Sequence, residues 1–229
     1  MDRKLVLLVT LLLVSGIVLT LTAYFFGVFS FDIEVALWLR EFDHPIFIVV
    51  MEAVSFFGNG WIPAMLVAGV AAICALRKKW LEAVFVVATL SAVLLTGVLK
   101  ELVGRPRPPT SAMNLYDMVP PINQYAYPSG HVLFFVVFFG FVAYLAWMQL
   151  TGWVRWLSIS FCTILIVLIG PSRIFLGEHW VSDVVGSYII GTFWLINLIL
   201  LYQMVLHWRR KKLKDRPAKI PDEPECSKL

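Results

Sequence analysis

Charged residues are scarce in this sequence. Only 15% of its 229 residues are Asp, Glu, Lys or Arg, whereas a soluble domain carries about a quarter. Hydrophobic residues make up 60% of the chain, and the mean hydropathy is +0.82. Several apolar runs approach the roughly 20 residues that a helix needs to cross a bilayer. This composition excludes an ordinary soluble enzyme and indicates a polytopic membrane protein.

Cysteine and metal-binding patterns are also scarce. The three cysteines, Cys74, Cys162 and Cys226, form no C-x-x-C pair, so neither a disulfide framework nor a thiolate metal site is indicated. No extended basic patch with interleaved aromatics occurs outside the basic ends, which argues against a nucleic-acid partner. The formal charge of +4 therefore reflects membrane topology.

The apolar runs predict an all-α membrane domain over residues 1–206. We expect six transmembrane helices and a short interfacial helical segment between residues 27 and 45, extended by residues 46–57. A signal peptide is the alternative for the first run, but that run exceeds a usual h-region and lacks a small-x-small cleavage site. Residues 207–229 are basic, then rich in proline and charge, and predict a disordered cytoplasmic tail. The expected spans are 5–26, 61–76, 80–99, 132–150, 154–169 and 184–206.

The basic residues predict the orientation of these spans. Six crossings place both termini on one side, which the excess of lysine and arginine marks as cytoplasmic. Five basic residues fall on the opposite face, against this trend, and an anionic substrate on the outer face would explain them. The cytoplasmic set is Arg3, Lys4, Arg77, Lys78, Lys79, Arg155 and the cluster from Arg209; the outer set is Arg40, Lys100, Arg105, Arg107 and Arg173.

Residues 171–183 form a polar patch between two apolar runs. His179 and Asp183 are four residues apart, so a helix that starts near His179 would stack them on one face. The carboxylate could then hold one imidazole nitrogen as N–H and leave the other free to attack an electrophile. Arg173 offers a planar fork of donors suited to a phosphate. The structural alternative is a polar loop in which Arg173 meets lipid headgroups.

Two further patches carry the same kind of chemistry. In the first, Lys100 precedes Arg107-Pro108 by seven residues. Both cations could instead snorkel at the membrane edge.

The second patch is Pro128-Ser129-Gly130-His131. Ser129 is a candidate N-cap, and Gly130 lets backbone N–H groups approach an anion. His131 could donate a proton to a leaving oxygen. The alternative for this patch is a capping turn with an incidental histidine.

Together the three patches resemble the signature of the type 2 phosphatidic acid phosphatase superfamily: K-x6-R-P, then P-S-G-H, then S-R-x5-H-x3-D. Every specified position matches, and the resemblance extends over roughly residues 5–206. It implies that His179 is the nucleophile, that Asp183 orients it and that His131 is the general acid. Arg105 also precedes a proline, so we expect it to make a lesser phosphate contact. We expect Ser172 to be structural, and Glu178, which has no role in the signature, to face water. The implied phosphate-binding residues are Lys100, Arg107, Ser129, Gly130 and Arg173.

The resemblance implies an integral-membrane lipid phosphatase in the plasma membrane, with its site on the extracytoplasmic face and a phosphohistidine intermediate. We expect no cofactor and no metal, because several cations and a helix N-terminus can stabilise a phosphoryl group directly. The loop 110–127 is short and mostly apolar, which favours undecaprenyl diphosphate as substrate. Phosphatidylglycerophosphate and phosphatidic acid remain alternatives, as do a lipid-to-lipid phosphotransferase and a non-catalytic transporter or lipid-binding scaffold. Vanadium-dependent haloperoxidases of the wider superfamily are soluble proteins. The predicted spans therefore argue against a haloperoxidase.

Overall fold

A computed structural model describes residues 3–108 and 125–214. These residues are almost entirely helical, and an isolated antiparallel bridge pairs Pro106 with Tyr125. The expected all-α fold is therefore confirmed for the described part of the chain. Its helices are α1 (Arg3–Phe26), α2 (Ser30–Arg40), α3 (Pro45–Phe56), α4 (Ile62–Leu76), α5 (Trp80–Ala88), α6 (Ser91–Val103), α7 (Gly130–Gln149), α8 (Gly152–Phe175) and α9 (Val181–Lys214).

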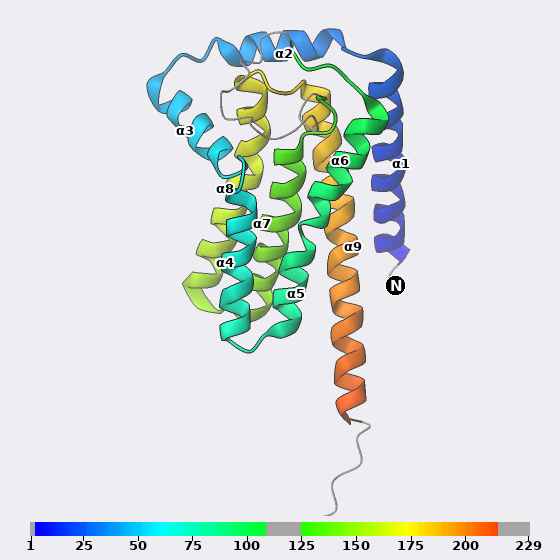
Figure 1. The fold of residues 1–229 in the computed structure, drawn as a ribbon, viewed down its shortest axis with the longest axis vertical. Coiled ribbons are helices and arrows are strands. Elements are labelled where there is room, and N and C mark those ends of the chain that lie inside the picture. Colours follow the sequence, from blue (N-terminus) through cyan, green and yellow to red (C-terminus); the bar gives the residue numbers. More distant parts are fainter. Residues whose placement is uncertain (1–2, 109–124, 215–229) are drawn as a thin grey trace, which may run out of the picture.

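Helix α7 forms the centre of the bundle (Figure 1). It packs against α6, α8 and α9, and it is apolar all round, which is the pattern of a helix buried on every side. Its phenylalanines Phe134, Phe135 and Phe138 are at most 2% exposed. The core of the fold therefore surrounds α7, and the first turn of α7 brings Ser129, Gly130 and His131 to one end of the bundle.

Five segments of the described chain are long and apolar enough to cross a membrane. One of them, Trp80–Val103, combines α5 and α6, which are interrupted where Thr89 Oγ1 donates to the carbonyl of Val86 at 2.6 Å. Such back-bonding commonly bends a helix. The expected span over 61–76 corresponds to α4, whose 15 residues extend about 22 Å against a hydrocarbon core of about 30 Å. The polytopic helical fold is thus confirmed, whereas six crossings remain a prediction.

Helix α2 lies across the end of the bundle where α1 and α6 end and α9 begins (Figure 1). Gly27 stops α1 with a φ of 65°, a conformation that favours glycine. The carboxylate of Asp32 then accepts a hydrogen bond from the N–H of Phe29 at 3.2 Å and stabilises the start of α2. The helical segment expected between residues 27 and 45 is therefore present.

The opposite end of the bundle carries the basic clusters. Figure 1 shows that the start of α1, the α4–α5 turn, the α7–α8 turn and the end of α9 are all directed away from α2. These segments contain the basic residues that were expected on the cytoplasmic side. Helix α9 continues beyond residue 206 to Lys214, and the domain boundary expected at residue 206 stays a prediction. Residues 215–229 of the expected tail lie outside the described residues.

Candidate active site

The three polar patches meet at the end of the bundle that α2 covers. Gly104 ends α6 in the left-handed conformation, with a φ of 62°, and the chain turns back there. The carbonyl of Arg105 accepts a hydrogen bond from the N–H of Ala126 at 2.8 Å, which places the first patch beside the second. Trp180 Nε1 donates to the carbonyl of Pro106 at 3.0 Å. These backbone contacts join patches that are far apart in the sequence.

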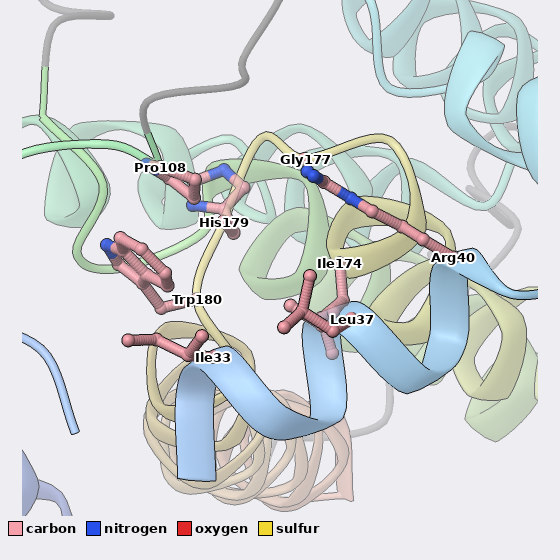
Figure 2. A pocket seen from close by; sticks show the side chains of 9 residues that line it. Ile33, Leu37, Arg40, Pro108, Ile174, Gly177, His179 and Trp180 are labelled. Carbon is pink, nitrogen blue, oxygen red and sulfur yellow. The ribbon is translucent and has the colours of Figure 1, made fainter. Parts of the chain in front are cut away.

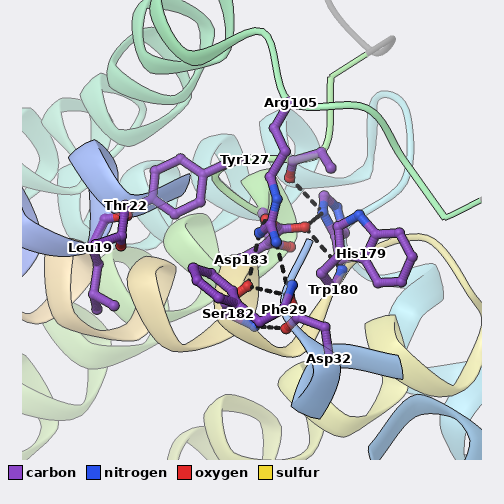
Figure 3. A network of polar contacts seen from close by, with 12 residues as sticks. Leu19, Thr22, Phe29, Asp32, Arg105, Tyr127, His179, Trp180, Ser182 and Asp183 are labelled. Carbon is purple, nitrogen blue, oxygen red and sulfur yellow. Dashed lines mark hydrogen bonds and ion pairs between the residues drawn. The ribbon is translucent and has the colours of Figure 1, made fainter. Parts of the chain in front are cut away.

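His179 is held by a backbone carbonyl. Its side chain is only 2% exposed, and its Nδ1 lies 2.7 Å from the carbonyl oxygen of Ala126. A carbonyl can only accept, so Nδ1 carries the proton and the lone pair is left on Nε2. The nearer oxygen of Asp183 is 3.8 Å from Nδ1. The expected partner, Asp183, is thus close to the imidazole (Figure 3). The hydrogen bond to Nδ1, however, is made by the carbonyl of Ala126.

The surroundings of His179 favour its neutral form. Burial lowers the pKa of His179 well below its ordinary value, and the positive charges of Arg173, Lys100 and Arg107 lower this pKa further. The hydrogen bond to Ala126 acts in the opposite direction and is outweighed. A neutral imidazole with a free Nε2 lone pair is the form that can attack an electrophile.

Asp183 caps the start of α9. Its Oδ2 accepts a hydrogen bond from the N–H of Trp180 at 2.8 Å, and its Oδ1 accepts one from Arg105. His179 precedes the first residue of α9, Val181, by two positions, so the helix begins slightly later than expected. The i, i+4 spacing still brings the imidazole and the carboxylate together. Asp183 therefore has both oxygens engaged while its charge stays near Nδ1 of His179.

Three cations surround the two histidines. Lys100, Arg107 and Arg173 act electrostatically on both His131 and His179. The side chain of Lys100, on the last turn of α6, is 4% exposed. None of the described residues makes a hydrogen bond or ion pair to its Nζ. A buried ammonium without a counterion is costly, and an anionic ligand would relieve that cost.

Glu178 lies between two of these cations. Its Oε2 pairs with Nη1 of Arg107 and lies 3.6 Å from Nη2 of Arg173. Glu178 is 5% exposed, so the expectation that it faces water is wrong. Arg173 also donates from Nη1 to Ser55 Oγ at 2.5 Å. A carboxylate thus occupies donors that the sequence assigned to a phosphoryl group.

The start of α7 offers further donors to an anion. Ser129 is fully buried, and its hydroxyl oxygen has no hydrogen-bond partner within the described chain. Its N–H donates to Ser187 Oγ at 2.7 Å, and Ser187 Oγ donates to the carbonyl of Asp183 at 2.6 Å. Gly130 packs closely on α6, since a Cβ there would lie 3.3 Å from Thr96 Cγ2. The first-turn N–H groups of α7 have no partner within the helix.

His131 rests on the loop between α3 and α4. Its Nε2 lies 2.8 Å from Asn59 Oδ1, so the ring donates and the amide oxygen accepts. A Cβ on Gly58 would lie 2.1 Å from His131 Cδ2, which means that the ring lies directly against the Gly58 backbone. Sequence reasoning assigned neither residue a role, although Gly58-Asn59-Gly60 is a recognisable turn signal.

The structure assigns other contacts to Ser172 and Arg105. Ser172 is buried in α8, which continues past Pro171 to Phe175, and its Oγ donates to the carbonyl of Met51 at 2.6 Å. The structural role expected for Ser172 is confirmed. Arg105, expected to contact phosphate, instead bonds to Asp32, Ser182 and Asp183, and its side chain is fully buried.

An apolar cavity of about 200 Å³ opens beside His179. Figure 2 shows Ile33, Leu37 and Arg40 of α2 on one side of it and His179 on another. The remaining labelled wall consists of Pro108, Ile174, Gly177 and Trp180. The described residues contain no group of three or more His, Cys, Asp or Glu side chains that could hold a metal ion.

The sequence of this chain is similar to those of known proteins. The profile of the PAP2 superfamily matches residues 81–210. An undecaprenyl-diphosphatase of Sulfolobus acidocaldarius is 28% identical over 120 residues, which cover 51% of this chain and 52% of that protein. The match therefore spans about half the length of that relative. A phosphatidylglycerophosphatase B of Bacillus subtilis is 27% identical over 160 residues, which cover 67% of this chain and 70% of the relative.

Two crystal structures share the fold. A transmembrane PAP2-type phosphatidylglycerolphosphate phosphatase from Bacillus subtilis aligns with a TM-score of 0.73 and 22% identity, over 86% of this chain and 96% of its own. LpxE of Aquifex aeolicus aligns with a TM-score of 0.55 and 18% identity, over 76% and 97% respectively. The profile match covers more than half of the sequence and includes each of the three polar patches. The chain therefore belongs to the PAP2 superfamily.

Proposed function

We propose that this protein is an integral-membrane lipid phosphatase that hydrolyses undecaprenyl diphosphate through a phosphohistidine on His179. The observation that carries the proposal is the hydrogen bond from His179 Nδ1 to the Ala126 carbonyl. It fixes the tautomer that presents Nε2 as a nucleophile, next to three cations that can neutralise an attacked phosphoryl group.

The proposed reaction has two steps. Nε2 of His179 attacks the terminal phosphorus, and the bond from phosphorus to the leaving oxygen breaks as the new P–N bond forms. His131 donates a proton to the leaving oxygen, and Lys100, Arg107 and Arg173 stabilise the charge on the equatorial oxygens. His131, now deprotonated, activates a water that cleaves the P–N bond, releases inorganic phosphate and restores His179.

The apolar cavity supports a lipid substrate with little to recognise beyond its phosphates. Its walls beside His179 are mainly aliphatic or aromatic, and Arg40 is the charged residue among them. A prenyl chain next to a diphosphate fits this chemistry, and one relative is named an undecaprenyl-diphosphatase. Most of the loop 110–127, which favoured the same substrate from its sequence, lies outside the described residues. Phosphatidylglycerophosphate is the second candidate, because another relative is named phosphatidylglycerophosphatase B.

The basic clusters support an extracytoplasmic site. They lie on the segments directed away from α2 (Figure 1), and the positive-inside bias assigns that end to the cytoplasm. The site at the α2 end would then open to the outer leaflet of the plasma membrane. Lipid products released there would return to the outer leaflet.

The substrate is tested with purified protein in matched detergent micelles. We expect phosphate release from undecaprenyl diphosphate, phosphatidylglycerophosphate and phosphatidic acid, with the highest kcat/KM for the first. A preference above tenfold for a glycerophospholipid, which corresponds to about 1.4 kcal/mol, would overturn the carrier-lipid assignment. EDTA should leave the rate unchanged. Labelled donor with an added acceptor lipid tests the alternative, since transfer of label to lipid instead of water would indicate a phosphotransferase.

A further inference from the structure

A buried ion-pair network connects α2 to the nucleophile. Asp32, on the first turn of α2, is fully buried. Its Oδ1 accepts a hydrogen bond from the N–H of Ser182 at 2.8 Å. Its Oδ2 accepts bonds from Ser182 Oγ and from Nη2 of Arg105, each at 2.8 Å. Asp32 thus contacts both Ser182 at the start of α9 and Arg105 in the first patch. Asp32 and Ser182 are 150 residues apart in the sequence.

Arg105 extends this network to Asp183. Its Nη1 donates to Oδ1 of Asp183 and, at 2.8 Å, to Ser182 Oγ. The side chains of Asp32, Arg105 and Asp183 all have zero exposure. Figure 3 shows Arg105 between the two aspartates, with His179 on the far side of Asp183. One guanidinium is therefore shared by two carboxylates, and only one of them adjoins the imidazole.

We propose that Arg105 and Asp32 are positioning residues for the transfer step and act through Asp183. This inference rests on the proposed function of the site. Arg105 holds Oδ1 of Asp183, which fixes the carboxylate so that Oδ2 faces Trp180 N–H and lies 3.8 Å from His179 Nδ1. Asp32 holds the other arm of the guanidinium and thereby fixes the direction from which Arg105 approaches Asp183.

The charge balance explains why two aspartates are needed. When Nε2 of His179 bonds to phosphorus, the imidazole gains positive charge, and the anionic Asp183 stabilises it. If Arg105 paired with Asp183 alone, the guanidinium would neutralise that anion. Because Asp32 shares the guanidinium, the three side chains together keep one net negative charge beside the imidazole.

A direct phosphate contact for Arg105 does not fit this geometry. Its two terminal nitrogens are both engaged by carboxylate or hydroxyl oxygens, and its side chain has no exposed surface. Arg107 differs, since its side chain keeps 17% exposure and its described partner is the single residue Glu178. Substitution of Arg107 should therefore weaken phosphate binding, whereas substitution of Arg105 should leave phosphate binding nearly unchanged.

The test compares Asp32→Asn and Arg105→Lys with the wild type in the lipid phosphatase assay. Glu34→Gln is the matched control, because it is the same kind of change at an exposed position of α2. We expect Asp32→Asn and Arg105→Lys to lower kcat about tenfold to a hundredfold, as for a misplaced catalytic group. KM and the inhibition constant of inorganic phosphate should change less than about twofold, and Glu34→Gln should behave as wild type. Arg107→Met should weaken phosphate inhibition.

A double-mutant cycle separates positioning from a general structural role. If Asp32 acts through Asp183, adding Asp32→Asn to Asp183→Asn should cause almost no further loss of kcat. Additive losses, or equal loss of kcat and of phosphate affinity in Asp32→Asn, would overturn the proposal, and so would wild-type kinetics in that variant. Failure of the proposed function is recognised separately, because the wild type would then release no phosphate from any lipid in the panel.

Discussion

Nδ1 of His179 lies 2.7 Å from the carbonyl oxygen of Ala126, and this contact determines which nitrogen can act. Ala126 is positioned in turn by its own N–H, which donates to the carbonyl of Arg105. The tautomer of His179 therefore depends on the pairing of residues 105–106 with residues 125–126. The side chain of Asp183 places a negative charge near the imidazole ring of His179. The backbone carbonyl of Ala126, and not Asp183, accepts the hydrogen bond from Nδ1.

His131 should matter most for poor leaving groups. Replacement of His131 with Ala removes the proton donor, so we expect kcat for an alkyl phosphate or lipid phosphate to fall by about 10²-fold or more. A nitrophenyl phosphate, whose leaving group needs no proton, should lose far less. The measurement is kcat for both substrates, and equal losses would remove His131 from the role of general acid.

Gly58 should be required for the position of the His131 ring. Gly58→Ala would place a methyl group about where the ring lies, so the ring must move, and the loss should follow the leaving-group pattern of His131→Ala. Gly69→Ala in α4 is the control, since a Cβ there meets nothing within 4 Å. Normal turnover of poor leaving groups by Gly58→Ala would contradict the contact.

The pH dependence should reflect the cations around His179. Burial and positive charge disfavour the imidazolium, so the pKa of His179 lies below its ordinary value of about 6.5. The decline of kcat/KM on the acid side of its pH profile, the acid limb, should therefore occur at a pH lower than that value. Lys100→Met removes one of the cations that lower the pKa of His179, so this pKa should rise and the acid limb should move to higher pH. Arg77→Met, at the opposite end of the bundle, should leave the limb in place, and a downward shift in Lys100→Met would be inconsistent with this cause.

Glu178 should compete with phosphate for Arg107 and Arg173. Glu178→Gln keeps the size of the side chain and removes the negative charge that pairs with both arginines. Inorganic phosphate should then inhibit more strongly, by about threefold to tenfold for an effect near 1 kcal/mol. The inhibition constant is the measurement, and weaker inhibition would mean that Glu178 orients the arginines instead of competing with the ligand.

The orientation of the chain is tested with introduced cysteines in a variant without the three native ones. Asp43→Cys, in the exposed α2–α3 turn, should react with an impermeant thiol reagent in intact cells. Arg77→Cys, exposed in the α4–α5 turn, should react only after the cells are permeabilised. The reverse pattern would place the site in the cytoplasm and would exclude a substrate in the outer leaflet.

The local features of the site were predictable because they depend on short spacings. His179 and Asp183 are four residues apart, and Ser129 precedes a long apolar run, so both fragments could be read directly. The family resemblance then supplied the expected role of each residue, and the profile match confirmed the family. Whether each of these residues has its expected role stays a prediction.

The long-range contacts were not predictable from one sequence. Asp32 meets Ser182 across 150 positions, and nothing near Asp32 distinguishes it from the other acidic residues of its segment. Glu178 stands next to His179, but its burial depends on Arg107, which arrives from a different patch. The fifth span was expected to cover residues 154–169, whereas α8 continues through Pro171 to Phe175. Transmembrane helices tolerate proline when neighbouring groups satisfy the freed backbone.

The central claim is that His179 itself carries the phosphoryl group during turnover. The direct measurement is rapid quenching of the enzyme with ³²P-labelled lipid substrate, followed by identification of the labelled residue. We expect an acid-labile, alkali-stable phosphohistidine at His179 in the wild type. Asp183→Asn should form it more slowly, and His179→Ala should form none and lose turnover. Near-normal hydrolysis by His179→Ala, or label on another residue, would contradict the account.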